Sequence, residues 1–292
     1  MSSANPLVTI ITPVFNAGRH LAKCMESVHQ QYFRDFEHII LDGGSTDDTL
    51  KIVADWQLQH PNIRLDTGKD KGVYDAMNKG IAMATGEWLY FLGADDYFYQ
   101  ANSLELIVPF LQKNEARIVY GDVYFESLGR LYDHRFDIEK ILKANICHQA
   151  VFYHADVFKQ IGGYDLNYRI AADYDFNLKC WLSGSIQYEY APVTVAYYSS
   201  GGLSSVNKDE SFIKDFPAHT IAATLTSNRP ITGKINILSK IYRKIIQRPQ
   251  YNAIVVSRNL FVSPGILIRL LAFIWMCLSS PLYGLRKKTK SG

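Results

Sequence analysis

The segment Gly86-Glu-Trp-Leu-Tyr-Phe-Leu-Gly-Ala-Asp-Asp-Tyr97 joins a run of large apolar residues to two adjacent acids. Trp88 to Leu92 is short, rich in aromatic residues and flanked by glycines, which is typical of a buried strand. Asp95 and Asp96 would then follow the carboxyl end of this strand, where open α/β sheets bind their ligands. Such a pair suits a hard cation, because Mg²⁺ is commonly held by one or two carboxylates and substrate phosphates. Adjacent Asp residues are also common in turns and at helix N-caps.

The first half of the chain alternates between strand-like and helix-like segments. β-Branched, apolar runs predict strands at 7–13, 36–42 and 63–67. Apolar residues at helical spacing predict helices at 20–31 and 73–84, and a further helix capped by Ser45 or Thr46. This alternation predicts an α/β fold with a mostly parallel sheet that is covered by helices on both faces.

Residues 98–205 show a different pattern of predicted helices and strands. We expect a helix near 101–113, strands at 117–125 and 147–153, a helix starting near residue 170, and a flexible loop at 199–205. The 292 residues are 48% hydrophobic and 20% charged, as in an ordered globular protein. Four scattered cysteines argue against a zinc site or a disulfide framework and fit a reducing compartment. No secretory signal is visible at the start of the sequence.

Charge is segregated along the chain. The net charge is only +3, but residues 216–292 contain twelve Lys or Arg and no acid. Residues 1–215 contain 19 basic and 28 acidic residues. This pattern predicts an anionic partner for the tail, either lipid or nucleic acid.

Four sequence segments together carry a family resemblance. They are Thr12-Pro-Val-Phe-Asn16, Asp42-Gly-Gly-Ser-Thr-Asp47, Gly72-Val-Tyr-Asp-Ala-Met-Asn-Lys-Gly80 and the strand that ends in Asp95-Asp96. Over about residues 6–205 the chain resembles the family-2 glycosyltransferases of the GT-A fold, in the manner of bacterial enzymes that build colanic-acid-type or O-antigen-type surface polysaccharides. The resemblance implies inverting transfer of a sugar from a nucleotide-sugar, with UDP as the expected nucleotide, to an acceptor hydroxyl, assisted by Mg²⁺ or Mn²⁺. It also implies a nucleotide-sugar-binding half at 1–97 and an acceptor-binding half at 98–205, which the extension at 206–292 follows.

On the donor side, the resemblance assigns Asp96 to direct metal coordination and Asp95 to the metal shell or the donor ribose. Pro13 and Phe15 fall where the family's first loop touches the nucleotide base. Asp42 matches the first acid of the family's Asp-Asp pair. The second acid, which contacts uracil in some members, is replaced here by Gly43. Asp70 and Lys71 lie in the donor-side loop, where a cation could meet the pyrophosphate.

On the acceptor side, Asp173 matches the aspartate of the Glu-Asp motif that supplies the family's general base. Ala172 occupies the Glu position, and the Gln-x-x-Arg-Trp motif of processive enzymes is absent. The chemistry itself requires a cation for the leaving diphosphate and a base for the acceptor proton. Asp173 could instead cap a helix, and Asp175 is the alternative base. His148 could touch acceptor or metal, or be structural.

Two rival functions use similar residues. One is a non-catalytic module that binds a sugar-nucleotide or a polysaccharide. The other is a nucleotidyltransferase, which would be expected to carry a Gly-rich, basic loop after the first strand. Thr12 to Gly18 contains no basic residue.

The tail combines basic and apolar segments. Residues 235–246 predict a basic amphipathic helix, residues 266–278 are apolar except for Arg269, and residues 286–290 form a basic cluster. The apolar core is shorter than the ~20 residues that a spanning helix needs. We therefore expect a helix in the cytoplasmic leaflet rather than a span over 260–285, with a buried helix pair as the alternative.

The expected location is cytoplasmic, at the inner face of the cell membrane. The expected partners are a nucleotide-sugar donor, a lipid-linked saccharide acceptor and the anionic membrane surface, but no nucleic acid.

Overall fold

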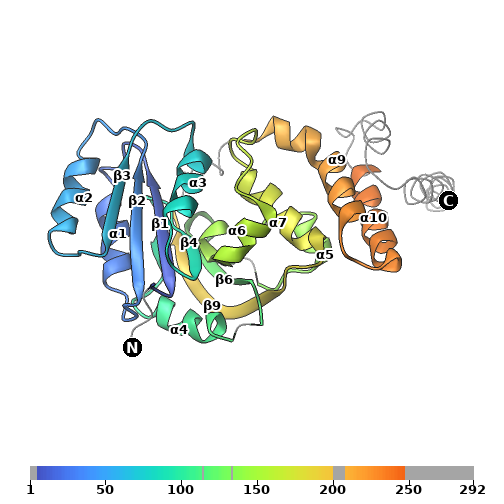
Figure 1. The fold of residues 1–292 in the computed structure, drawn as a ribbon, viewed down its shortest axis with the longest axis horizontal. Helices are drawn as coiled ribbons and strands as arrows, with labels where there is room; N and C mark the ends of the chain where they lie inside the picture. Colours follow the sequence, from blue (N-terminus) through green and yellow to red (C-terminus); the bar gives the residue numbers. More distant parts are fainter. Residues whose placement is uncertain (1–4, 114, 133, 200–207, 247–292) are drawn as a thin grey trace. The chain divides into compact units, whose positions relative to one another are not determined.

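The computed structural model describes residues 5–113, 115–132, 134–199 and 208–246 (Figure 1). The chain divides into two compact units. The first comprises residues 1–180 and 186–209, and the second comprises residues 181–185 and 210–292. The functional boundaries expected at residues 97 and 205 stay a prediction.

The N-terminal half of the first unit is a parallel sheet. In spatial order its strands are β3 (Ile63–Thr67), β2 (Phe36–Asp42), β1 (Val8–Val14) and β4 (Trp88–Phe91). They are connected by the helices α1 (Leu21–His29), α2 (Thr49–Gln57) and α3 (Val73–Met83). Every residue of β2 is buried, because both faces of the sheet are covered. The parallel arrangement predicted for this half is confirmed.

The second half of the same sheet is mixed. Beyond β4 it continues with β8 (Val151–His154), β6 (Ile118–Phe125), β9 (Tyr188–Tyr198) and β5 (Tyr97–Phe98), and β7 (Arg130–Tyr132) pairs with β6. β8 runs antiparallel to β4 and β6, whereas β9 is parallel to β6. The prediction of a mostly parallel sheet therefore holds only as far as β4. The strand expected at 147–153 begins at Val151, after a 3₁₀ turn at His148–Ala150.

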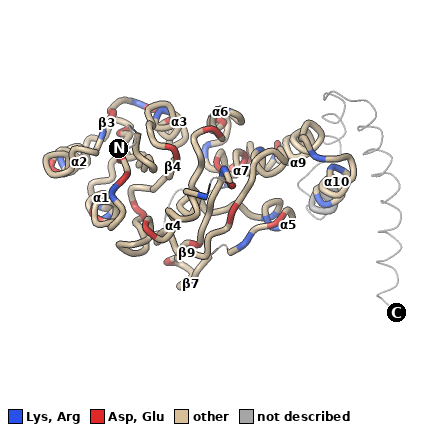
Figure 2. Tube along the Cα trace, turned by 60° about the horizontal axis from the view of Figure 1, so that its bottom comes forward, with Lys and Arg blue, Asp and Glu red and all other residues tan. Residues whose placement is uncertain are grey.

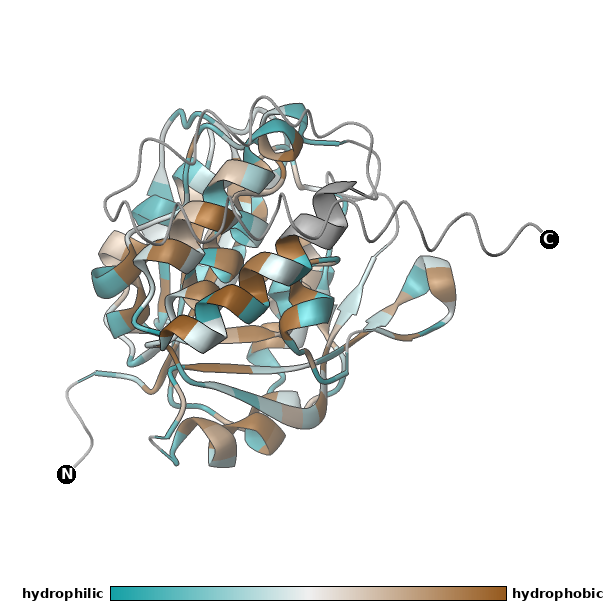
Figure 3. Ribbon diagram, turned by 90° about the vertical axis from the view of Figure 1, so that its right-hand side faces the viewer, coloured by the Kyte–Doolittle hydropathy of each residue, from teal (hydrophilic) through white to brown (hydrophobic). Residues whose placement is uncertain are grey.

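The helices cover both faces of the sheet. α1 and α4 (Ser103–Leu111) bury Cys24, Val28 and Leu104 in the same apolar cluster as Trp88 and Tyr90 of β4. On the other face, a Cβ built on Gly80 of α3 would lie 2.6 Å from Ile11 Cγ2, so this helix packs directly on β1. Further α-helices of this unit are α5 (Ile138–Ile141) and α6 (Ala155–Ile161), and α7 (Ala172–Ser183) lies in it up to residue 180. Figure 3 shows that hydrophilic and hydrophobic residues alternate along the helices, whereas the strands contain longer hydrophobic stretches.

Glu37 is a buried acid that connects the amino-terminal ends of several strands. Glu37 of β2 accepts hydrogen bonds from Thr9 Oγ1 at 2.8 Å and from the Thr85 backbone N–H at 2.6 Å, and it pairs with Arg64 at 2.8 Å. Burial would raise the pKa of Glu37, but these donors outweigh burial and lower it. Each donor favours the charged form, so Glu37 is a satisfied structural acid.

The second unit contains two packed helices, α9 (Glu210–Thr226) and α10 (Ile231–Ile246). The helix predicted at 235–246 is confirmed as part of α10, which carries Lys and Arg but no acid (Figure 2). Ile237 and Ile241 are buried, so these two side chains are not available to a bilayer. No helix in the described part of the chain is long and apolar enough to cross a membrane. The segments at 260–285 and 286–290, and the loop beyond Ser199, lie outside the described residues.

Candidate active site

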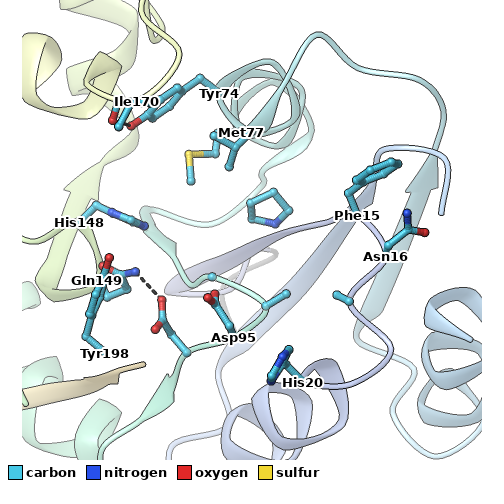
Figure 4. A pocket seen from close by; sticks show the side chains of 16 residues that line it. Phe15, Asn16, His20, Tyr74, Met77, Asp95, His148, Gln149, Ile170 and Tyr198 are labelled. Atoms are coloured by element: carbon cyan, nitrogen blue, oxygen red, sulfur yellow. Dashed lines mark hydrogen bonds between the residues drawn. The ribbon is translucent and has the colours of Figure 1, made fainter. Parts of the chain in front are cut away.

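A pocket of about 370 Å³ lies at the carboxyl ends of β1 and β4 (Figure 4). Its position agrees with the rule that open α/β sheets bind ligands beyond their strand ends. Among the predicted residues, Pro13, Phe15, Asp95 and Asp96 line this pocket. Asp42, Asp70, Lys71 and Asp173 are not part of its wall. The other lining residues are Asn16, Ala17, His20, Val73, Tyr74, Met77, Gly93, Ala94, His148, Gln149, Ile170 and Tyr198.

The turn after β4 brings its two carboxylates together. The Asp96 backbone N–H donates to the Gly93 carbonyl at 3.0 Å, which closes the turn. A Cβ built on Gly93 would lie 2.7 Å from Asp96 Oδ2 and 3.0 Å from Asp95 Oδ1. Both carboxylates therefore face the small space above Gly93, and any larger residue at this position would fill that space.

Asp96 is held by two residues that come later in the chain, one in the 3₁₀ turn before β8 and one directly after β9. The side-chain amide of Gln149 donates a short hydrogen bond to Asp96 Oδ2, and the Ser199 backbone N–H donates to Asp96 Oδ1 at 2.9 Å. Ser199 Oγ also donates to the Asp95 carbonyl at 2.6 Å. Burial, and then the nearby charge of Asp95, raise the pKa of Asp96 to about 7. Asp96 is therefore partly protonated near pH 7, and the residues that line the pocket include no Lys or Arg.

These features fit a divalent cation. Carboxylate oxygens suit Mg²⁺ or Mn²⁺, and the space above Gly93 lies between two of them. No group of three or more His, Cys, Asp or Glu residues in the described ranges could hold a metal ion. The two aspartates would therefore need substrate phosphates and water to complete the coordination shell.

The loops after β1 and β2 are tied to each other. The Asn16 backbone N–H donates to Ser45 Oγ at 2.8 Å, and Asn16 Oδ1 accepts from the Thr46 N–H at 2.9 Å. Ser45 and Thr46 are therefore used by the first loop, and the prediction that one of them caps α2 is wrong. α2 begins at Thr49, with Asp48 at the N-cap position.

Asp42 closes the second of these loops. It is 3% exposed, and its carboxylate accepts from the backbone N–H groups of Gly44 and Ser45 at 3.1–3.2 Å. Such a turn, in which Asp bonds the backbone two residues on, is a common structural use of this residue. In this arrangement the Asp42 carboxylate holds the turn that follows β2.

Asp70 and Lys71 lie in the loop before α3. Asp70 Oδ1 accepts from the Gly72 backbone N–H at 2.9 Å, and the Lys71 N–H donates to Asp75 Oδ2 at 3.0 Å. Gly72 has a φ of 127°, which favours glycine at this position. Lys71 is exposed, and its contact with a pyrophosphate stays a prediction.

Asp173 lies in the first turn of α7. Its carboxylate accepts from Tyr74 Oη at 2.8 Å and from Asn145 Nδ2 at 2.7 Å, and it is 8% exposed. Tyr74 Oη also lies 2.7 Å from the Ile170 carbonyl. The carboxylate thus lies just behind Tyr74, which belongs to the pocket wall.

His148 separates Asp173 from the pocket. Its Nδ1 lies 3.7 Å from Asp173 Oδ2, and its ring lines the pocket (Figure 4). Burial lowers the pKa of His148, although Asp173 opposes this shift, so the imidazole is neutral near pH 7. Asp175, the alternative base, forms an ion pair with Lys179 at 2.6 Å and does not line the pocket.

Several residues of the site were not predicted from the sequence. His20, Met77 and Tyr198 line the pocket, and Asn145 and Ser199 hold its acids. Gln149 follows His148 directly, so the Cys-His-Gln segment could have indicated it. The other residues come from parts of the chain that are distant in sequence and meet only in the fold.

A family model assigns the chain to a known protein family. The model described as "Glycosyl transferase family 2" matches residues 9–162, and the chain belongs to this family. It is therefore a glycosyltransferase. A curated relative from Mycobacterium tuberculosis (strain ATCC 25177 / H37Ra), named "PGL/p-HBAD biosynthesis glycosyltransferase", is 43% identical over 226 residues, which cover 74% of this chain and 86% of the relative.

Solved structures show the same fold. Staphylococcus aureus TarS 1–349 in complex with UDP-GlcNAc superposes with a TM-score of 0.67 at 17% identity, and the match covers 87% of this chain and 79% of that one. The mannosyltransferase PcManGT from Pyrobaculum calidifontis, in complex with GDP-Man and Mn²⁺, gives a TM-score of 0.56 at 14% identity over 98% and 89% of the two chains. The GT-A fold class predicted from the sequence is confirmed.

Proposed function

We propose that this glycosyltransferase moves a sugar from a UDP-sugar to a hydroxyl of a lipid-linked saccharide, with inversion at the anomeric carbon. The observation that carries the proposal is the set of residues that line the pocket beyond β4. Asp95 and Asp96 line it after the end of β4, and Tyr74 and His148 line it in front of Asp173. A donor bound here would have its leaving diphosphate at the two aspartates and its anomeric carbon open to an acceptor hydroxyl near His148.

Asp95 and Asp96 would hold Mg²⁺ or Mn²⁺ together with the donor diphosphate. When bound, the cation supplies charge stabilisation to the departing diphosphate. Gln149 and Ser199 fix the orientation of the Asp96 carboxylate, so that it does not have to reorganise when the donor arrives. Pro13 and Phe15 would bound the nucleotide end of the pocket.

Asp173 is the general base in this proposal. A carboxylate on the acceptor side takes the proton of the attacking hydroxyl, as the chemistry requires. The hydroxyl then attacks the anomeric carbon on the face opposite the leaving diphosphate, and a single displacement of this kind inverts the configuration. Tyr74 and Asn145 hold the carboxylate in place, and the neutral His148 beside it can pass the proton toward it.

The relatives support the choice of donor and acceptor. TarS was solved in complex with UDP and with UDP-GlcNAc. The mycobacterial relative is named for PGL/p-HBAD biosynthesis. A saccharide anchored in a membrane is the acceptor class that best suits a chain whose last 77 residues hold twelve basic residues and no acid. Such a tail would hold the enzyme at the inner face of the cell membrane.

A donor panel tests the proposal. The full-length protein is incubated with UDP-, GDP-, CDP- and ADP-sugars and Mg²⁺ or Mn²⁺, and release of nucleoside diphosphate is measured with and without a lipid-linked saccharide extract. We expect metal-dependent release from a UDP-sugar, stimulated by the extract, and a product whose anomeric configuration is inverted by NMR. A retained configuration would overturn the inverting mechanism, and release from another nucleotide alone would overturn the choice of UDP.

A further inference from the structure

Three loops at the nucleotide end of the first unit gather around Gly43. Its backbone N–H donates to the Val14 carbonyl at 2.9 Å, which places it beside Phe15. The Gly68 N–H donates to the Asp42 carbonyl at 2.9 Å, which brings the loop after β3 to the same point. A Cβ built on Gly43 would lie 2.6 Å from Asp70 Oδ2 and 3.5 Å from Phe15 Cδ2.

The carboxylate of Asp70 therefore occupies the space that a side chain at position 43 would need. A second acid at position 43 and Asp70 in its present position exclude each other, both by contact and by like charge. Asp70 Oδ1 accepts from Gly72, and among the described residues Oδ2 has no hydrogen-bond partner. An acceptor oxygen thus remains available next to an aromatic ring.

Phe15 supplies the second half of this site. Phe15 is 65% exposed although it lines the pocket, so an aromatic face is accessible to a ligand there. A flat heteroaromatic ring can stack on an exposed aromatic face, as bases do in nucleic-acid-binding proteins. A carboxylate oxygen beside the stacking face accepts hydrogen bonds and donates none when ionised. The Phe15 ring and the Asp70 carboxylate together favour a nucleobase that has a ring N–H.

We propose that Asp70 reads the ring N–H of the donor nucleobase, in place of the acid that is missing at position 43. Uracil offers N3–H between two carbonyls, and guanine offers N1–H beside its amino group. Cytosine and adenine present an unprotonated ring nitrogen at the corresponding position, which would face the carboxylate as a second acceptor. The proposal rests on the proposed function and narrows it, since it assigns donor-base selectivity to one carboxylate.

Methylated nucleotides test this contact directly. Calorimetry in Mn²⁺ compares UDP with N3-methyl-UDP, and GDP with 1-methyl-GDP, on the full-length protein and on Asp70→Asn. We expect the wild type to bind the methylated form of its preferred nucleotide roughly 10- to 100-fold more weakly, as for loss of a hydrogen bond to a charged group. In Asp70→Asn this ratio should shrink several-fold, and CDP should gain affinity, because the amide can donate to cytosine N3. Asp70→Asn keeps an oxygen for the Gly72 N–H, so the loop retains its hydrogen bond.

Two further variants distinguish recognition of the nucleobase from the general effect of one negative charge. Asp66→Asn removes an exposed acid from β3 and controls for the general effect of one negative charge on a polyanionic ligand. We expect this control to discriminate between UDP and N3-methyl-UDP as the wild type does. The double variant Gly43→Asp/Asp70→Gly returns the acid to the neighbouring loop, and we expect it to recover discrimination that Asp70→Gly alone has lost.

The outcomes are distinct. Equal binding of methylated and unmethylated nucleotides by the wild type, or undiminished discrimination by Asp70→Asn, would overturn the role of Asp70 and leave the glycosyl transfer intact. A wild-type preference for CDP or ADP would also overturn it. If the full-length protein binds none of the four nucleotides in Mn²⁺, the proposed donor function fails, and the inference fails with it.

Discussion

Asp96 is a buried acid whose neighbours hold it in one orientation. Replacing it with Asn keeps an oxygen for Gln149 or Ser199 but removes the negative charge next to Asp95. We expect Asp96→Asn to fold and to lose divalent-dependent binding of UDP in calorimetry. Because the pKa of Asp96 is about 7, the wild type should also bind UDP with Mn²⁺ more weakly at pH 6, where the acid is largely protonated, than at pH 8. Unchanged affinity of the variant in Mn²⁺ would contradict the assignment, and Asp66→Asn is its charge-matched control.

Asp173 serves a separate step, so its variant should behave differently. Asp173→Asn can still accept from Tyr74 or Asn145, and we expect its donor affinity to match that of the wild type. Its turnover should fall by about 10²–10⁴-fold, the usual contribution of a general base. The measurement is a rate assay at saturating donor beside a UDP titration. Turnover within a few-fold of wild type would move the role to another group, and His148→Asn tests the neighbouring imidazole in the same assay.

Sequence reasoning found the residues that depend on a single strand. Pro13, Phe15, Asp95 and Asp96 line the pocket because each lies at or shortly after the carboxyl end of a parallel strand, and those ends meet at one edge. Gln149 and Ser199 hold Asp96 from 53 and 103 residues away in sequence. Their contribution depends on the positions of β8 and β9 in the sheet, on either side of β6, which no local pattern specifies.

At the scale of elements, α1 and β2 are joined by two histidines. His38 Nδ1 lies 3.3 Å from His29 Nε2, and Thr12 Oγ1 lies 2.9 Å from His38 Nε2. The His29 ring also contacts His60, and the Arg34 guanidinium donates to the His29 carbonyl. Burial, followed by the charges of His60 and Arg34, lowers the pKa of His29 to about 4, and burial also lowers the pKa of His38. Both rings are therefore neutral in the folded protein near pH 7.

This pair predicts a loss of stability in mild acid. The unfolded chain takes up protons near pH 6.5 whereas the folded chain does not, so the free energy of unfolding should fall as the pH drops from 6.5 toward 4. From His29 alone the fall at pH 5 is roughly 2 kcal/mol. Urea unfolding at pH 7.5 and pH 5 measures it. His29→Gln, which keeps a side-chain nitrogen but cannot titrate, should show a smaller difference, and an equal difference would show that His29 is not the cause.

The element boundaries show where local patterns fail. β9 carries Pro192 in its middle, and its pairing with β6 shifts register between Tyr120 and Val123. Proline removes a donor from a strand, so this segment lacks a clean strand pattern although it pairs with both β6 and β5. The shorter strands β5 and β7 have two and three residues, which is too few for any periodicity to be recognised.

For the whole molecule, the charge asymmetry is the feature that sequence alone supplies. The apolar run at 266–278 and the basic cluster at 286–290 follow α10, in which Ile237 and Ile241 are already buried. We therefore expect a chain that ends at Ile246 to lose binding to anionic liposomes, since each basic residue near such a surface contributes about 1 kcal/mol. The truncation keeps α9 with α10 and should leave UDP binding unchanged.

Co-sedimentation with vesicles of anionic and of neutral lipid measures this binding for both chains. High-salt and carbonate extraction of the full-length protein then distinguishes a peripheral from an inserted tail. If the full-length chain ignores anionic vesicles, or the truncated chain binds them equally well, the membrane role of residues 247–292 is wrong.

Tyr74 belongs to the helix that follows the Asp70 loop, yet its hydroxyl holds Asp173 and lies against the Ile170 carbonyl. One short helix therefore connects the part of the protein proposed to meet the nucleotide with the acid proposed to activate the acceptor. We infer that an adjustment of the loop around a bound nucleotide would reach that acid through the segment that joins Asp70 to Tyr74. The consequence concerns the order of events in turnover: the base would be brought into register only once the donor is in place, so that the acceptor binds second.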